Sequence, residues 1–262
     1  MDGATHPLIE AAGLSKKFAM LPQDVRRYGT RDFLRIAFGL PRELPLRPGE
    51  FWALDDLSFS LAPGESLAVL GRNGAGKSTL LKLITGHMLP DAGTLAVRGS
   101  VGVLAIGQFG FQPMLTGRDN IVQKAVALGM RKQDILPLVP EIIEFADIGP
   151  FIDAPVRSYS SGMVARLGFA VAIHVNPDIL LADEALSAGD AEFARKCAER
   201  IADMRRRMSL VIVTHSPEFA RDICTRAIVL ERGRTVFEGT AAAASDFYRG
   251  MIGPDAVSTV SA

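Results

Sequence analysis

The chain has 262 residues, of which 48% are hydrophobic and 22% charged, as in ordinary globular proteins that bury a core without disulfides. It carries 29 Lys and Arg against 29 Asp and Glu, so its charge gives no general attraction to nucleic acid. Cys197 and Cys224 are too few for a cysteine-based metal site and indicate reduced thiols. These features exclude a disordered tail, a collagen and a disulfide-stabilised miniprotein.

The sequence predicts no membrane span and no signal peptide. The longest uncharged run, residues 99–117, is interrupted by glycines, Pro113 and two glutamines. Asp2 and Glu10 stand where a signal peptide needs a basic and then an apolar stretch. We therefore expect a cytosolic chain that is able to dock on a membrane partner.

The first part of the chain predicts two strands on either side of an insertion. Residues 8–18 suggest a short strand and turn, and residues 52–61 alternate like a strand. Residues 19–50 between them are rich in arginine and proline. Within them, the apolar residues of RDFLRIAFGL recur at helical spacing, with arginines on another side. We interpret residues 19–50 as a basic amphipathic insertion.

The rest of the chain alternates strands of the buried type with helices. Strands are expected within residues 66–71, 94–106, 178–183 and 210–215, and helices within residues 77–87 and over much of 117–176. This alternation predicts an α/β fold with a mostly parallel sheet. There is no internal repeat, so we expect one such unit rather than two in tandem.

The strongest motif is GRNGAGKST, which follows a buried-type strand and opens a helix. It fits G-x-x-x-x-G-K-[ST], a loop whose glycines let backbone N–H groups surround phosphate oxygens. Lys77 would neutralise the β and γ oxygens, the Ser78 hydroxyl would bind Mg²⁺, and the helix N-terminus would add positive potential. The predicted nucleotide-binding residues are Gly71, Arg72, Asn73, Gly74, Ala75, Gly76, Lys77, Ser78 and Thr79.

Three further candidates end the later strands. DILLADE ends in Asp183 and Glu184, and LVIVTH ends in His215; in a parallel sheet such ends face the ligand crevice. Asp183 would hold Mg²⁺, usually through water, and Glu184 would polarise the attacking water. His215 would contact the γ-phosphate and hold Glu184 and the water in line. The alternatives are an acidic helix N-cap and a structural histidine beside Ser216.

The order of these motifs resembles that of the ATP-binding cassette (ABC) ATPases over roughly residues 8–240: phosphate loop, helical stretch, YSSGM, DILLADE, SAGD and VTHS. The resemblance implies a P-loop NTPase core with a mostly parallel sheet, an antiparallel β subdomain and a helical subdomain at about 109–168 that carries the signature motif. Residues 1–262 would then form a single nucleotide-binding domain that ends in a C-terminal tail at 241–262.

The signature motif is usually LSGGQ and here reads Tyr159, Ser160, Ser161, Gly162, Met163. A serine hydroxyl, free amides and a helix N-terminus together make an anion clamp. In the family this clamp reaches the γ-phosphate of ATP on the opposite subunit, which implies a homodimer around two ATPs. SAGD would be the D-loop, with Asp190 crossing the interface and Gly189 in place of the usual leucine. A plain N-capped helix start is the alternative for YSSGM.

The resemblance leaves two nucleotide contacts open. Gln108 is assigned as the glutamine that touches Mg²⁺ and couples the site to the membrane partner. Its spacing to Pro113 is one residue shorter than the common pattern, and Gln112 competes for the role. Phe18 lies where an aromatic residue stacks on adenine, and Trp52 is the rival candidate.

Several local features resemble one subgroup, the ATPase subunits of bacterial capsule, O-antigen and teichoic-acid exporters: YSSGM, FGFQPMLTGRDNI, DEALSAGDAEFARKC and EFWALDDLSF after an insertion. This implies ATP and Mg²⁺ as cofactors, a multi-span permease as partner and a lipid-linked polysaccharide as substrate. The subunit would be peripheral at the cytoplasmic face of the inner membrane. Residues 19–50 would lie near the lipid-linked diphosphate at the channel mouth; the alternative is a solvated basic loop.

Other classes fit the sequence less well. Soluble ABC ATPases that act on DNA or the ribosome usually carry two cassettes, a coiled coil or basic arms, so no nucleic-acid partner is expected. A GTPase would need N-K-x-D, which is absent, and a kinase would leave YSSGM unexplained. The motif residues Lys77, Asp183, Glu184 and His215 argue against a non-hydrolysing regulator. We predict a transport-coupled ATPase, the alternatives being the ATPase of another ABC transporter or a soluble ABC ATPase.

Overall fold

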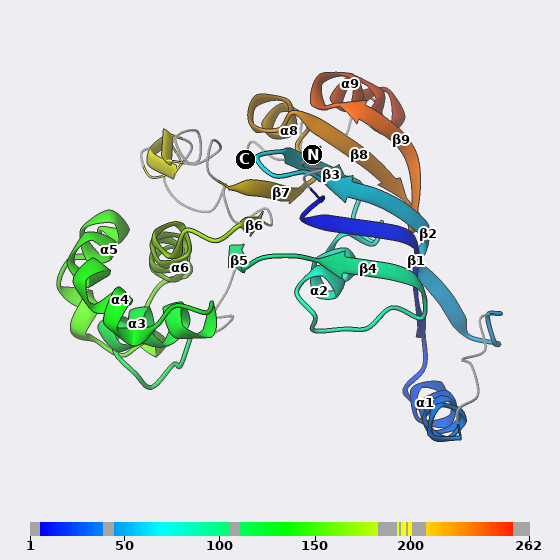
Figure 1. Cartoon of the computed structure of the whole chain (residues 1–262), viewed down its shortest axis with the longest axis horizontal. Helices are drawn as coiled ribbons and strands as arrows, with labels where there is room; N and C mark the ends of the chain where they lie inside the picture. The colour runs from blue at the N-terminus through cyan, green and yellow to red at the C-terminus, as the bar shows by residue number, and fades with distance from the viewer. Residues whose placement is uncertain are drawn as a thin grey trace, which may run out of the picture.

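The structure is a computed structural model, and it describes residues 6–38, 45–104, 111–182, 193, 195–197, 199–200 and 208–253. In Figure 1 the protein has three parts: a small antiparallel sheet, a larger and mostly parallel sheet, and a group of helices set to one side of both. None of the helices in the described part of the chain has the length and apolar character needed to cross a bilayer.

The small sheet consists of β1 (Ile9–Ala19), β2 (Glu50–Leu61) and β4 (Ala92–Val97) in the order β2-β1-β4, with antiparallel pairing. Helix α1 (Pro22–Ala37) connects β1 to β2 and lies at the far end of this sheet, away from the group of helices (Figure 1). It begins before the RDFLRIAFGL segment, since Pro22 suits the first position of a helix.

The larger sheet has the strand order β5-β6-β7-β3-β8-β9. The strands are β3 (Ser66–Leu70), β5 (Val101–Leu104), β6 (Ile179–Ala182), β7 (Ser209–Thr214), β8 (Arg226–Glu231) and β9 (Arg234–Thr240). All neighbours pair in parallel except β8 and β9. The residues of β3, β6 and β7 are buried throughout, as their unbroken apolar sequences predicted. The predicted α/β fold is therefore confirmed.

Two apolar cores cover the faces of the larger sheet. On one face, helix α2 (Lys77–Ile84) packs between the two sheets, where Leu80 joins Leu14 and Leu54 of the small sheet. On the other face, α8 (Pro217–Ile223) and α9 (Ala241–Ile252) pack against the strands. Residues 241–252 of the predicted C-terminal tail therefore form a packed helix, in which Tyr248 is 2% exposed. Residues 254–262 lie outside the described residues.

The group of helices has its own core. Its members are α3 (Gly117–Ala127), α4 (Lys132–Ile135), η1 (Leu136–Leu138), α5 (Val139–Ala146), η2 (Gly149–Asp153), η3 (Val156–Ser158) and α6 (Ser161–Val175). Helix α6 contributes Leu167 and Val171 to this core but Phe169 and Ile173 to the core of the larger sheet. It therefore joins the helices to the sheet.

Tyr159, where the usual signature has leucine, is an anchor of the helical core. Its ring is buried, and its hydroxyl donates a hydrogen bond of 2.6 Å to the carbonyl of Phe151. Gly117 makes room for it, because a Cβ at that position would collide with the hydroxyl oxygen. The helical core therefore accommodates the tyrosine side chain, and the tyrosine fixes the chain just before Ser160.

Candidate functional site

The phosphate loop, residues 71–79, leaves the carboxyl end of β3 and enters α2. Two of its glycines are required by close backbone approach. A Cβ on Gly71 would lie 2.7 Å from the carbonyl oxygen of Leu230, and one on Gly76 would collide with the carbonyl oxygen of Ala53. Gly76 also has φ of 108°, which disfavours any other residue. The loop is therefore pressed against both sheets with no space for side chains at these points.

Lys77 is the buried cation of this loop. Its side chain is turned back across the loop, and its ammonium donates hydrogen bonds of 2.6 Å to the carbonyl of Gly71 and 3.3 Å to that of Arg72. Lys77 is 8% exposed, whereas Asn73 and Ser78 are exposed. The first N–H groups of α2 have no intrahelical partner. A buried cation, helix N–H donors and an exposed hydroxyl are the donor set that a magnesium-bound triphosphate requires.

His215 lies beside this loop. Leu70 of β3 pairs with Thr214 of β7, so Gly71 and His215 leave adjacent parallel strands at the same level of the sheet. The imidazole is half-buried, and the chain after it is fixed by Ser216, whose hydroxyl caps α8 by accepting from the N–H of Phe219 at 3.3 Å. The structure thus brings the phosphate loop and His215 to one edge, while the role of His215 stays a prediction.

Several predicted residues cannot be placed. Asp183 and Glu184 follow directly on β6, but with Gln108 and Asp190 they lie outside the described residues. Gln112 is described: its N–H donates to the side chain of Asn120 at 2.6 Å, inside the group of helices. That contact is structural and does not decide between Gln108 and Gln112.

The two candidates for stacking on adenine lie on neighbouring strands. Phe18 of β1 pairs with Phe51 of β2, and their rings are 6.2 Å apart. Trp52 is the next residue of β2 and precedes Ala53, which contacts the phosphate loop. Phe18 and Trp52 are both half-buried, so either ring is accessible from solvent. Phe51, which is 40% exposed, is a third aromatic residue there that sequence analysis did not name.

Gly233 helps to hold the phosphate loop in place, and the sequence analysis did not identify it. Its N–H donates to the carbonyl of Ala75 at 3.1 Å, and its carbonyl accepts from the N–H of Asp55 at 2.9 Å. A Cβ there would lie 2.8 Å from the carbonyl oxygen of Ala53. The turn between β8 and β9 therefore ties the phosphate loop to the small sheet. The only local signal was its turn sequence ERGR.

The YSSGM segment begins α6. The Ser160 hydroxyl accepts from the N–H of Met163 at 3.2 Å, so this serine is the N-cap of the helix. Capping by Ser160 is compatible with an anion clamp, and the role of YSSGM as a signature motif stays a prediction. Ser160 and Ser161 are exposed and Gly162 is partly exposed, so the positive end of a 15-residue helix faces solvent.

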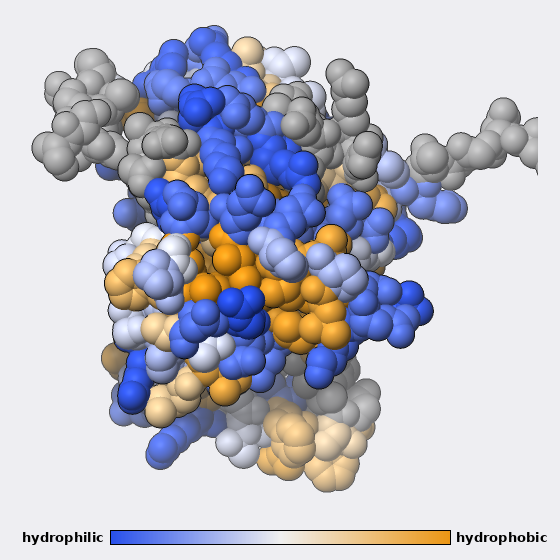
Figure 2. Space-filling model, turned by 90° about the vertical axis from the view of Figure 1, so that its left-hand side faces the viewer, coloured by the Kyte–Doolittle hydropathy of each residue, from blue (hydrophilic) through white to orange (hydrophobic). Residues whose placement is uncertain are grey.

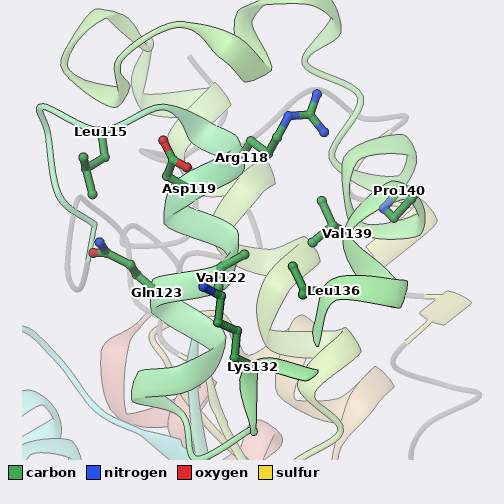
Figure 3. Close-up of a pocket in the computed structure, with 9 residues that line it drawn as sticks. All are labelled: Leu115, Arg118, Asp119, Val122, Gln123, Lys132, Leu136, Val139 and Pro140. Atoms are coloured by element: carbon green, nitrogen blue, oxygen red, sulfur yellow. The ribbon is translucent and has the colours of Figure 1, made fainter. Parts of the chain in front are cut away.

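A groove of about 700 Å³ lies on the outer side of the helices, between α3 and the α4–α5 segment (Figure 3). Its apolar lining residues are Leu115, Val122, Leu136, Val139 and Pro140, and its polar ones are Arg118, Asp119, Gln123 and Lys132. Figure 2, viewed from the side of these helices, shows an apolar area surrounded by hydrophilic residues. An apolar centre with a polar margin is typical of surfaces at which one protein binds another.

Comparisons with known proteins agree with this geometry. A family model described as ABC transporter matches residues 54–187. The O-antigen export system ATP-binding protein RfbB of Klebsiella pneumoniae is 38% identical over 246 residues, which are 93% of this chain and 98% of that protein. The teichoic acids export ATP-binding protein TagH of Bacillus anthracis is 41% identical over 204 residues, 77% of this chain but only 37% of that protein.

Solved structures are similar in fold. A dimeric ATP-binding cassette in a post-hydrolysis state, bound to ADP and phosphate, superposes with a TM-score of 0.70 at 20% identity, covering 89% of this chain and 98% of that chain. An ATP-binding subunit of an ABC transporter gives the same TM-score and covers 93% of each chain.

Proposed function

Because the chain belongs to the ABC transporter family, as the ATPase domain of such a transporter, we propose that its ATP hydrolysis drives export of a lipid-linked polysaccharide. The polymer would be of the capsule or O-antigen type and would cross the inner membrane, with the subunit peripheral at the cytoplasmic face. The observation that carries this proposal is the similarity to an O-antigen export ATP-binding protein over almost all of that protein. A match that came only from the motifs common to all ABC ATPases would cover a smaller part of the two chains.

The phosphate loop would bind the triphosphate. The N–H groups of residues 74–79 would donate to its oxygens, and Lys77 would exchange its carbonyl contacts for the β and γ oxygens. The Ser78 hydroxyl would be a ligand of Mg²⁺, together with Asp183 and Gln108. When bound, Mg-ATP supplies the phosphoryl group that is transferred to water.

Glu184 and His215 would act on the attacking water. Glu184 would accept a hydrogen bond from the water and orient it, and His215 would hold the γ-phosphate and the water in line. The pairing of Leu70 with Thr214 supports this role, since it brings His215 to the level of the loop.

The site would be completed by a second copy of the chain. Ser160, Ser161 and Gly162 of one subunit would contact the γ-phosphate held by the other, and Asp190 would cross the interface. Their exposure at the N-terminus of α6 supports this arrangement. The working form would therefore be a homodimer around two Mg-ATP molecules.

The groove between α3 and α5 would receive the membrane permease. It is apolar at its centre, with charged residues at its margin, as expected for a protein docking site of moderate size. When this chain is purified from its native membranes, a multi-span membrane protein should therefore copurify with it.

Helix α1 would lie at the channel mouth, near the diphosphate of the lipid-linked substrate. It is held firmly, because Asp32 forms an ion pair with the buried Arg47, whose guanidinium lies 4.9 Å from the ring of Tyr28. Phe33 and Phe38 are 69% and 78% exposed. An amphipathic helix with arginines and exposed aromatic rings suits a lipid surface and phosphate groups.

The function is tested in a strain that carries Lys77→Ala as its sole copy. The variant should lack nucleotide affinity, and the cells should lose surface polysaccharide and accumulate the lipid-linked polymer inside. A strain with Arg195→Met, which alters an exposed pair with Glu199, is the control and should export normally. Normal surface polysaccharide in the Lys77→Ala strain would contradict the proposal.

The role of α1 has its own test. Reversing the charges of Arg31 and Arg35 should reduce export and leave the basal ATPase rate of the isolated subunit intact. Unchanged export would show that α1 is a solvated surface element.

A further inference from the structure

Helix α3 has two faces with different surroundings. Its outer face lines the groove through Arg118, Val122 and Gln123 (Figure 3). Its inner face is buried against α6 and carries Ile121 and Lys124. Lys124 is only 7% exposed. A cation therefore lies directly behind the groove, inside the helical core.

The surroundings of Lys124 are close and specific. Its ammonium lies 4.2 Å from the centre of the Phe111 ring, a distance at which the ring face attracts a cation. On α6, a Cβ at Gly168 would lie 3.4 Å from this ammonium and 3.5 Å from the Phe111 ring. These are ordinary van der Waals distances, so α6 packs closely against both the ammonium and the ring at this point.

This charge is kept at a cost to the fold. Burial lowers the pKa of Lys124 from 10.5 to about 8, because the charged form loses its hydration. A methionine would fill a similar volume without that cost. The buried polar neighbour Asn120 donates through its amide to the carbonyls of Gln112, Leu115 and Thr116 and so holds the turn before α3 together. A costly cation beside a functional surface points to a functional use.

We propose that Lys124 is a positioning residue that transmits docking in the groove to the signature serine Ser160. The inference rests on the proposed function, in which the groove receives the permease and Ser160 contacts ATP. A partner that shifts α3 would press the ammonium against Gly168 and Phe111, because close-packed interiors transmit displacement. Gly168 lies on the same helix that Ser160 caps, so α6 would carry the shift to its exposed N-terminus.

The experiment uses the reconstituted permease–ATPase complex and, separately, the isolated subunit. In Lys124→Met the stimulation of ATPase activity by the permease should be lost, with kcat of the complex reduced about tenfold and KM for ATP unchanged. The isolated subunit should keep its basal rate, and its thermal midpoint should not fall. Lys124→Arg, which keeps the cation on Phe111, should restore most of the stimulation.

Two results would overturn the inference, and they are distinguishable. If the wild-type complex is stimulated and Lys124→Met is stimulated equally, Lys124 has no positioning role and the proposed function stands. If the permease does not stimulate even the wild-type ATPase, the proposed function fails and the inference fails with it. Lys82→Met, which removes an exposed lysine from α2, is the matched control and should behave as wild type.

Discussion

Replacing Lys124 with methionine should make the protein more stable at neutral pH. The unfolded chain holds this proton with the ordinary pKa of 10.5, and the folded chain holds it with a pKa of about 8. At about 1.4 kcal/mol per pKa unit, keeping the charged form buried costs the fold about 3 kcal/mol. Loss of the favourable contacts of the ammonium, that with the Phe111 ring among them, returns about 1–2 kcal/mol. The net gain at pH 7 should therefore be about 1–2 kcal/mol.

The pH dependence identifies the cause of this gain. Below pH 8 both states of the wild type bind the proton, and the cost is fully present. Between pH 8 and 10.5 the folded state releases the proton while the unfolded state retains it, so the free energy of unfolding rises with pH. Lys124→Met lacks this rise, and its advantage over the wild type should disappear as the pH approaches 10.

The assay is urea denaturation of the isolated subunit at intervals from pH 7 to 10, with the wild type, Lys124→Met and Lys82→Met. The difference between wild type and variant removes the contributions of all other titrating groups. A difference that stays constant over this range would refute the assignment of the lowered pKa to Lys124.

Three further outcomes are expected. Gly76→Ala should abolish binding of a fluorescent ATP analogue and destabilise the chain by at least about 1 kcal/mol, because its Cβ meets the Ala53 carbonyl at a positive φ. Tyr159→Phe should lower the free energy of unfolding by about 1 kcal/mol in urea titrations, since it removes the buried hydrogen bond to the Phe151 carbonyl, which also accepts from the N–H of Ala154. Glu184→Gln should retain ATP binding, hydrolyse about 10²-fold more slowly and elute as a dimer in Mg-ATP; a monomer would contradict the proposed sandwich.

The fold was predictable where burial dominates the local sequence. Strands β3, β6 and β7 are buried on both faces, and such strands consist of consecutive apolar residues. The helix within the predicted tail was missed although Thr240, which caps α9 by accepting from the N–H of Ala243, was a readable start signal. An alanine run with few large apolar residues gave no clear periodicity there.

The site was predictable only in its contiguous pieces. Residues 71–79 predict a phosphate loop because phosphate binding requires glycine, lysine and serine at set spacings. Gly233 escaped detection because its contacts with Ala75 and Ala53 join distant parts of the chain. The same holds for Lys124, whose ammonium lies close to Gly168 of another helix. Contacts of this kind are set by tertiary packing, which a pattern in one segment does not encode.

Helix α6 links the group of helices to the larger sheet. Phe169 and Ile173 pack in the core of the larger sheet, while Leu167 and Val171 pack among the helices. Because both sets lie within one continuous helix, the helices cannot rotate against the sheet unless α6 is repacked on one side. Any displacement that the groove imposes on α3 therefore either moves α6 with it or is stopped there, and the N-terminus at Ser160 is the exposed point where that displacement would reach a bound phosphate.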